Sequence, residues 1–388
     1  MAQNYLINMP ETHLKEQRLN PIIKWAGGKE LELHQILPNL PINFNRYFEP
    51  FVGGGAVYFA INKSEMFIND KSNELIDLYR LIKNQDSAFF SHLLIINKNW
   101  RLIENIISNH YKYFLDLYKN FSKGMLSKLQ TENQIISFVV HNADEFNGIL
   151  ETSFNINIDN FLKEVKRNLI NKISRMKNIE SKKGKLSDED ILKNVESALK
   201  SAYYMHFRHL YNKSQKYSLD PKFSSAIFFF IREFCYASMF RYNMNGDFNV
   251  PYGGIQYNRK DFLKKIQSLQ SEEYQSHLQF THIYNLDFLD FLNTTKPKSN
   301  DFIFLDPPYD SEFSTYARNS FSKQDQIRLA KYLYESCANF MLVIKKTDFI
   351  LSLYSNHNFK IHKFSKKYLV SFQDRNEKQS EHLVITNY

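Results

Sequence analysis

The chain has 388 residues, a length that predicts two domains or one large domain carrying an insertion. Hydrophobic residues make up 43% and charged residues 23%, which is typical of a folded soluble protein with a sizeable core. The formal net charge of +9 favours an anionic partner, either nucleic acid or an acidic membrane face.

The cysteines and the apolar runs exclude several classes of protein. Cys235 and Cys337 stand far apart and fit neither a metal site nor a disulfide pattern, so no metal is predicted. So few cysteines are compatible with a reducing compartment. The N-terminus lacks a basic start followed by an apolar run, and the longest apolar run, SSAIFFFI, is too short to span a bilayer. We therefore expect a cytoplasmic protein without a membrane partner.

Residues 21–83 have the pattern of an α/β unit. RYFEPFVGGG indicates a strand that ends in a glycine turn, AVYFAIN a short helix, and SEMFIND a second strand that ends in an acid. The spacing of apolar residues in SNELIDLYRLIKN then predicts a helix, with Ser72 and Asn73 as candidate caps.

The middle of the chain changes character. Between about 87 and 220 glycine is scarce, and LIENIISNHYKYFLDLYKNF and FLKEVKRNLINKISRMKNI have helical periodicity. A further helix is expected after Ser187, a candidate N-cap followed by acids. The Lys and Arg residues between Lys163 and Lys185 are either a solvated helix face or DNA contacts.

Strand and helix alternate again after 275. QFTHIYNLDF, DFIFLDPPY and NFMLVIKKTDF are candidate strands, SKQDQIRLAKYLYES a helix, and the C-terminal segment a hairpin. The pattern predicts an α/β protein in which a parallel-rich sheet domain, made of 1–86 and 259–388, is interrupted by a helical insertion and hairpin at 87–258.

The stretch FIFLDPPY places an acid where a buried strand meets two prolines. Ligands of open α/β sheets bind at the carboxyl ends of strands, and the prolines make a stiff turn there. The Asp306 carboxylate and the Pro307 carbonyl could accept the two hydrogens of an NH₂ group, while the Tyr309 ring stacks on the plane that carries it. The alternative is a proline turn with a surface tyrosine.

A second candidate site element is the glycine turn of EPFVGGGAVYF. Gly53, Gly54 and Gly55 follow a strand, and glycines at such a position let a ligand approach the backbone closely. Neither this turn nor WAGGKE fits a dinucleotide or P-loop pattern, so a small nucleoside ligand is expected. Asp70, at the end of the next strand, could accept hydrogen bonds from a ribose or act as a helix cap.

Seven blocks, in the same order, resemble the Dam-like, or D12-class, DNA adenine-N6 methyltransferases. They cover roughly residues 21–85 and 227–388. They are PIIKWAGGK, YFEPFVGGGAVYF, INDKSNELIDLYRLIK, MFRYNMNGDFNVPYGG, IYNLDF, FLDPPYDSEFSTYA and EHLVITNY. The resemblance implies a Rossmann-like, S-adenosylmethionine-dependent methyltransferase sheet, with 87–258 as the inserted DNA target-recognition domain.

The resemblance also implies roles for residues. S-adenosylmethionine would be the methyl donor, and its binding residues would be Trp25 and Lys29 at the methionine end, Gly53 and Gly55 beneath it, Asp70 at the ribose, Asp287 and Phe288 at the adenine, and Asp306 between cofactor and target base. The catalytic residues would be Asp306, Pro307 and Tyr309.

The implied activity is methyl transfer to N6 of an adenine flipped out of double-stranded DNA at a specific site. The same turn serves cytosine N4 and RNA amino groups, and a basic chain could also be a catalytically silent DNA-binding regulator. A restriction–modification, phage or solitary context would fit. A cognate restriction endonuclease acting on the same site without a stable complex is a candidate partner.

The stretch FRYNMNGDFNVPYGG predicts a hairpin, because Asn-Gly is a strong hairpin signal. Arg241 and Asn243 are the candidate DNA-binding residues, with simple packing on the sheet as the alternative. Ala237, Ser238 and Met239 stand where GATC-specific members carry an Asn-Gly-Leu-like stretch, so GATC recognition is not predicted.

Overall fold

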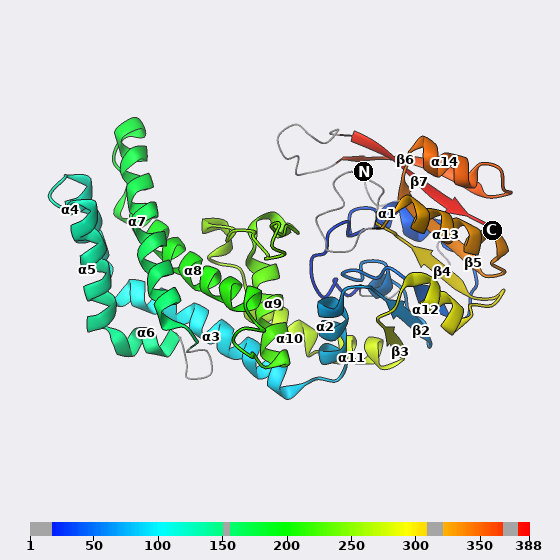
Figure 1. Ribbon diagram of the computed structural model, residues 1–388, viewed down its shortest axis with the longest axis horizontal. Coiled ribbons are helices and arrows are strands. Elements are labelled where there is room, and N and C mark those ends of the chain that lie inside the picture. The colour runs from blue at the N-terminus through cyan, green and yellow to red at the C-terminus, as the bar shows by residue number, and fades with distance from the viewer. Residues whose placement is uncertain (1–17, 150–155, 309–320, 368–378) are drawn as a thin grey trace. The chain divides into compact units, whose positions relative to one another are not determined.

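The computed structural model describes residues 18–149, 156–308, 321–367 and 379–388, and the chain forms two compact units (Figure 1). The sheet unit comprises Met1–Gln85, Phe240–Tyr242 and Leu269–Tyr388. The helical unit comprises Asp86–Met239 and Asn243–Ser268. The sequence predicted domain boundaries at 86/87 and 258/259. In the structure the boundaries lie after Gln85 and before Leu269, and the hairpin residues Phe240–Tyr242 belong to the sheet unit.

The sheet unit carries seven strands. They are β1 (Tyr47–Glu49), β2 (Met66–Asn69), β3 (Thr281–Tyr284), β4 (Phe302–Leu305), β5 (Asn339–Lys345), β6 (Lys360–Lys367) and β7 (Gln379–Thr386). Its helical segments are α1 (Leu33–Ile36), η1 (Leu37–Asn39), η2 (Tyr58–Ala60), α2 (Asn73–Lys83), α11 (Glu272–Gln279), α12 (Phe288–Thr295), α13 (Lys323–Glu335) and α14 (Asp348–Tyr354). The α/β fold predicted from the sequence is confirmed.

The strand order explains where a ligand can bind. The seven strands lie in the order β3-β2-β1-β4-β5-β7-β6, and all neighbours are parallel except β7, which is antiparallel to β5 and β6. The chain therefore runs outward in one direction from β1 and in the other from β4. In open α/β sheets such a switch point leaves a crevice outside the carboxyl ends of the two strands. Glu49 and Asp306 stand at these two ends.

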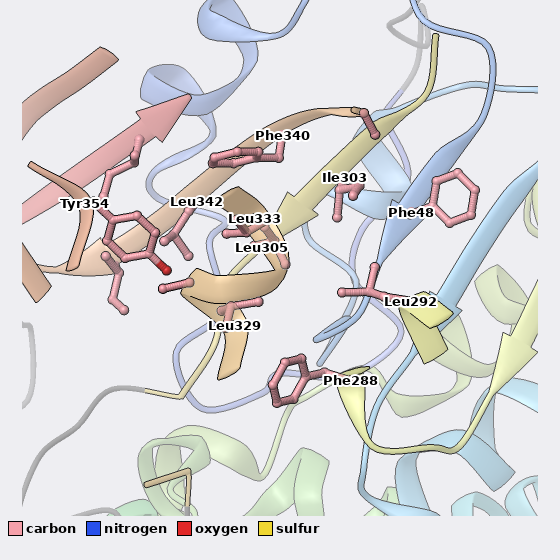
Figure 2. Packing of buried hydrophobic residues seen from close by; sticks show 14 of the residues in the cluster. Phe48, Phe288, Leu292, Ile303, Leu305, Leu329, Leu333, Phe340, Leu342 and Tyr354 are labelled. Carbon is pink, nitrogen blue, oxygen red and sulfur yellow. The ribbon is translucent and has the colours of Figure 1, made fainter. Parts of the chain in front are cut away.

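One face of the sheet is covered by α12, α13 and α14. Phe288 and Leu292 of α12, Leu329 and Leu333 of α13 and Tyr354 of α14 are buried with side chains from β1, β4 and β5 (Figure 2). Side chains alternate along a strand, so Tyr47 and Glu49 lie on the face opposite Phe48. Apolar packing on both faces is expected of a parallel sheet and explains why β1, β2 and β4 are buried along their whole length.

In the described residues, the helical unit consists of helical segments of very different length. They are α3 (Ser87–Asn109), α4 (Tyr111–Ser122), α5 (Lys128–His141), α6 (Ala143–Ile149), α7 (Ile158–Lys183), α8 (Asp188–Asn212), α9 (Pro221–Phe234), η3 (Tyr236–Ser238), η4 (Ile255–Tyr257) and α10 (Phe262–Leu269), the last reaching into the sheet unit by one residue. Within the described ranges, none of these helices has the length and apolar character needed to cross a bilayer.

Candidate N-cap residues in the sequence predicted the starts of two helices. The side chains of Ser72 and Ser187 accept hydrogen bonds from Leu75 and Asp190, as expected of N-caps. Asn73 is instead the first residue of α2. The helical periodicity of LIENIISNHYKYFLDLYKNF extends through His110, but this residue leaves the helical conformation and separates α3 from α4.

A buried cation joins the helices to the segment that follows the hairpin. Lys200 of α8 is fully buried, and its Nζ lies 2.7 Å from Glu104 Oε1 and 3.0 Å from Glu196 Oε1. The same Nζ donates to the carbonyl of Asn258 at 2.7 Å. A buried ammonium needs such partners, because leaving it unpaired costs several kcal/mol. The segment around Asn258 is therefore held on α3 and α8.

The glycine turn after β1 is packed against the protein's own backbone. A Cβ added to Gly54 would lie 2.3 Å from the carbonyl oxygen of Ile23, and Ile22 donates to the Gly54 carbonyl at 3.2 Å. A Cβ on Gly55 would meet Tyr79 and Phe59 at 2.5 and 2.8 Å. The sequence suggested that these glycines let a ligand approach the backbone; at Gly54 and Gly55 the missing side chain also makes room for the protein's own atoms.

We expect Gly54→Ala to lower the free energy of unfolding by about 1–3 kcal/mol, because the methyl group overpacks a contact between two backbone segments. Gly148→Ala is the matched control. Gly148 lies in α6, where an added Cβ meets its nearest atom at an ordinary 3.7 Å and alanine favours the helix. Urea unfolding measures both; equal stability of the two variants would contradict this packing.

Candidate active site

The Asp306 carboxylate is paired with a buried lysine. Asp306 follows β4 directly, and its side chain is 17% exposed. Lys29, only 2% exposed, forms an ion pair with Asp306 Oδ2 and also donates to the carbonyl of Gly27 at 2.9 Å. The two residues are 277 positions apart in the chain. Lys29 thus ties the N-terminal loop to the exit of β4.

The proline turn that follows is held from α13. Pro307 is buried, and the carbonyl of Pro308 accepts a hydrogen bond from Gln326 Nε2 at 3.2 Å. Gln326 is fully buried. An amide buried on the inner face of an amphipathic helix needs a polar partner, and the turn supplies one. The periodicity of SKQDQIRLAKYLYES gave no reason to single out this glutamine.

A second buried acid lies close to the ion pair. Glu49 ends β1, is 2% exposed, and accepts a hydrogen bond from the Tyr47 hydroxyl at 2.6 Å. Burial raises the pKa of the Glu49 carboxyl well above its ordinary value. The Tyr47 hydrogen bond opposes this rise and the negative charge of Asp306 adds to it. An acid inside the apolar run YFEPFV is the sequence signal that could have identified Glu49.

Asp70 is fixed by backbone amides at the end of β2. Its Oδ2 accepts from Gly53 N at 3.1 Å and its Oδ1 from Ser72 N at 2.9 Å. Burial raises the pKa of the Asp70 carboxyl, against the lowering effect of these hydrogen bonds. A carboxylate has about four acceptor positions. Backbone amides thus occupy part of this capacity, and Asp70 is able to accept a further hydrogen bond from a ligand hydroxyl.

Asn69 joins the loops that follow three strands. Its Nδ2 donates to the carbonyls of Pro50 and Leu286 at 3.0 and 3.1 Å, and its Oδ1 accepts from Leu286 N at 2.8 Å. Asn285 donates in turn to the Asp70 carbonyl at 2.8 Å. These bonds lock the carboxyl ends of β1, β2 and β3 together. Asn69 was missed in the sequence because it continues an apolar strand.

Trp25 lies against the glycine turn. A Cβ on Gly53 would approach Trp25 Cδ1 to 2.9 Å, and Gly53 has a positive φ of 50° that favours glycine. The indole also packs edge-on against Phe240, with ring centroids 4.3 Å apart. Of the predicted cofactor residues, the structure therefore brings Trp25, Gly53 and Asp70 together in one set of contacts and Lys29 and Asp306 in another.

Asp287 and Phe288 are engaged in other interactions. Asp287 caps α12, and its Oδ1 accepts from Arg328 Nη2 at 2.7 Å. The Arg328 guanidinium also lies 5.0 Å from the centre of the Phe288 ring. Phe288 is 4% exposed and packs on Phe51 at 5.5 Å. A ligand contact by Asp287 would have to share the carboxylate with Arg328, which the sequence gave no reason to expect.

The remaining predicted residues are the catalytic candidate Tyr309 and the DNA-binding candidates Arg241 and Asn243. Tyr309 lies outside the described residues. Arg241 belongs to the sheet unit and is partly exposed. Asn243 is exposed and opens a turn in the helical unit, in which its N–H donates to the Asp247 carbonyl at 2.9 Å and its carbonyl accepts from Gly246 N at 2.9 Å. The Asn-Gly turn predicted from the sequence is therefore present.

The segment before this hairpin has a strained backbone. Ala237 and Ser238 have φ angles of 50° and 53°, in the left-handed region that most residues avoid. Arg232, 1% exposed, donates to the carbonyls of Ser238 and Met239 at 3.2 and 2.5 Å. The buried guanidinium thus binds the carbonyls of Ser238 and of the residue after it, next to a backbone conformation that asparagine and glycine adopt more readily.

The chain is similar to known methyltransferases along almost its whole length. The Type II methyltransferase M.CviBI of Paramecium bursaria Chlorella virus NC1A is 26% identical, over 95% of this chain and 100% of that protein. The Type II methyltransferase M.MjaIII of Methanocaldococcus jannaschii is 28% identical, over 95% and 99%. A DNA adenine methylase of Vibrio cholerae is 22% identical, over 82% and 76%.

The family assignment rests on a broader match. The sequence profile of the D12 class N6 adenine-specific DNA methyltransferases matches residues 25–199 and 189–370. The matched residues include the Lys29–Asp306 ion pair, the Gly53–Asp70 hydrogen bond and the whole helical unit. The helical unit thus lies within the family match, although the sequence alone offered no resemblance for 87–220. The chain therefore belongs to the D12 class N6 adenine-specific DNA methyltransferase family.

Proposed function

We propose that this member of the family transfers a methyl group from S-adenosylmethionine to N6 of an adenine in double-stranded DNA, with Asp306 and Pro307 as the residues that bind the reacting amine. The observation that carries the proposal is the position of Asp306. Its carboxylate stands at the switch point of the sheet and is held there by a lysine that is almost completely buried.

The residues at the carboxyl ends of β1 and β2 fit the proposed cofactor. Asp70 keeps acceptor capacity for a ribose hydroxyl, and its orientation is set by Gly53 and Ser72. Trp25 contacts the same turn and supplies an aromatic surface at the methionine end. Lys29, Gly55, Asp287 and Phe288 complete the proposed set, Asp287 while bound to Arg328. S-adenosylmethionine supplies a methyl group on a positively charged sulfur.

The chemistry required of the protein is mainly positioning. The lone pair of adenine N6 is delocalised into the ring, so the amine is a poor nucleophile. The Asp306 carboxylate and the Pro307 carbonyl each accept one of its hydrogens, which favours a tetrahedral nitrogen with its lone pair directed at the methyl group. Orientation and electrostatic stabilisation of this kind supply on the order of 7–11 kcal/mol. We assign to Asp306 the proton that N6 releases after transfer.

Lys29 and Glu49 control the charge beside the amine. Lys29 binds Oδ2 of Asp306 and thereby fixes the orientation of the carboxylate that we assign to the amine. Burial raises the pKa of Glu49, which favours its neutral form and weakens its competition with Asp306 for Lys29. The pair therefore presents a negative oxygen in a fixed direction without adding net charge to a largely buried region.

An adenine inside a duplex is inaccessible, so the base must leave the stack at a cost of a few kcal/mol. We propose that Tyr309 stacks on the extruded ring and offsets about 1–3 kcal/mol of this cost. Arg241 and Asn243 are the proposed contacts to the DNA around the target.

Asp306→Asn is expected to reduce methyl transfer at least 10²-fold while DNA binding persists, because the substituted amide accepts the amine hydrogen poorly. Transfer of labelled methyl groups to mixed-sequence DNA measures the rate. Asp348→Asn, on the exposed first turn of α14, is the control and should keep full activity. Resolving the wild-type product into nucleosides should yield N6-methyladenine; N4-methylcytosine would refute the assigned substrate.

Tyr309→Ala should lose more methyl-transfer activity than Tyr309→Phe, since phenylalanine keeps the ring that stacks on the base and alanine removes it. The rates are compared on duplex DNA and on DNA with a mismatched target adenine, which is easier to extrude. A smaller deficit of Tyr309→Ala on the mismatched substrate is expected. Equal losses for both variants would argue against stacking.

Glu49→Gln is expected to change how stability depends on pH. In the wild type the unfolded chain releases the Glu49 proton above about pH 4.5, while the folded protein retains it because its pKa is raised. Wild-type stability therefore falls with increasing pH by up to about 1.4 kcal/mol per unit from this group. Glutamine has no proton to release, so the variant should gain stability relative to wild type between pH 4.5 and 7. Urea unfolding across this range tests it; a constant difference would show that Glu49 is ionised when folded.

A further inference from the structure

The positive charge of the chain is concentrated in the helical unit. Lys and Arg number 26 there and Asp and Glu 18, a surplus of eight out of the net +9. The sheet unit, with 24 and 23, is almost neutral. The unit that lacks the proposed catalytic residues therefore carries nearly all of the attraction that a polyanion would feel.

The hairpin is docked on one end of this unit, at the C-terminus of α8. Asn212, the last residue of α8, donates to the Phe248 carbonyl at 2.9 Å and accepts from Phe248 N at 2.8 Å. This pair of bonds fixes the return side of the hairpin. The turn between Asn243 and Asp247 projects beyond it, and Met244 at its tip is fully exposed.

Three lysines surround the same end of α8. Lys163 comes from the start of α7, and Lys213 and Lys216 follow α8 directly. The pKa of His209, in the last turn of α8, is lowered first by burial and then by the charges of Lys213, Lys216 and Lys163. The imidazole therefore lies within the electrostatic reach of all three ammonium groups. We call Lys163, Lys213 and Lys216 the lysine cluster.

Little negative charge opposes the lysine cluster. Lys213 Nζ lies 3.4 Å from Asp247 Oδ1, which links the cluster to the hairpin turn. Lys163 and Lys216 are exposed, and within the described residues neither forms an ion pair. The loop that carries Lys216 is nonetheless ordered by side-chain bonds, since Tyr217 accepts from Asn157 at 2.7 Å and its hydroxyl lies 3.0 Å from His209 Nε2.

We propose that the lysine cluster is a binding surface for the phosphate backbone of DNA next to the base pairs that the hairpin meets. The inference rests on the proposed function for the identity of the polyanion. Phosphate contacts position a protein on the duplex, and base contacts then read the sequence. The hairpin is anchored by Asn212, and Lys163 and Lys216 beside it form no ion pair within the described part of the chain, so both tasks can be carried out at the C-terminal end of α8.

The test compares two double variants with the same loss of charge. Lys163→Gln with Lys216→Gln removes two cations of the cluster. Lys182→Gln with Lys183→Gln removes two exposed cations at the other end of α7, roughly 28 Å away along the helix. The dissociation constant of each full-length protein for a duplex of mixed sequence is measured from 50 to 200 mM NaCl.

Removing two phosphate contacts should reduce the slope of log K against log salt by about 1.8 and weaken binding at every salt concentration. The control variant should keep the wild-type slope. In methylation assays the cluster variant should show a raised KM for DNA with an unchanged kcat. Equal slopes for both variants, or a wild type whose DNA binding does not depend on salt, would overturn the inference. Because the slope reports binding alone, a wild type that binds DNA without methylating it would contradict the proposed activity and leave the cluster supported.

Discussion

The ion pair between Lys29 and Asp306 is the interaction on which the rest of the site depends. Both charges lie in a largely buried region, where each is tolerated only because the other is present. A buried carboxylate without a cation would be protonated or turned towards water, and could no longer accept a hydrogen from an amine. The loop that carries Lys29 must therefore be held firmly. Gly54 makes this possible, because only a residue without a side chain lets Ile23 approach the turn after β1.

The two units use polar side chains in different ways. In the sheet unit buried amides such as those of Asn69 and Gln326 donate hydrogen bonds to backbone carbonyls and fix loops at the carboxyl ends of strands. In the helical unit buried charges such as Lys200 brace the segment after the hairpin, while unpaired lysines remain at the surface. The strained residues Ala237 and Ser238 lie just before the chain passes from the helical unit to the sheet unit at Phe240, and the buried Arg232 binds the carbonyl of Ser238.

Much of the fold could be predicted from the sequence, because its signals are local. Apolar runs marked the strands, and Ser72 and Ser187 marked helix starts. Asp306 could be singled out because a charge between a buried strand and two prolines has few structural explanations. The supporting residues could not be predicted, for a physical reason. Gln326 and Asn69 owe their roles to partners elsewhere in the chain, and a single polar residue within an apolar pattern does not reveal which partner it will bind. Arg328 likewise gave no sign that it would engage Asp287.

The insertion between α2 and β3 has a consequence for the order in which the protein can assemble during synthesis. Lys29 leaves the ribosome long before Asp306, and Asn69 cannot bind Leu286 until a further 217 residues have been synthesised. Contacts so distant in sequence form late, whereas helices such as α7 and α8 are neighbours in the chain and can pair at once. The helical unit is thus able to reach its native structure while β1 and β2 are still waiting for their partners. During that interval two short apolar strands remain uncovered, and exposed apolar strands of this kind are prone to aggregation.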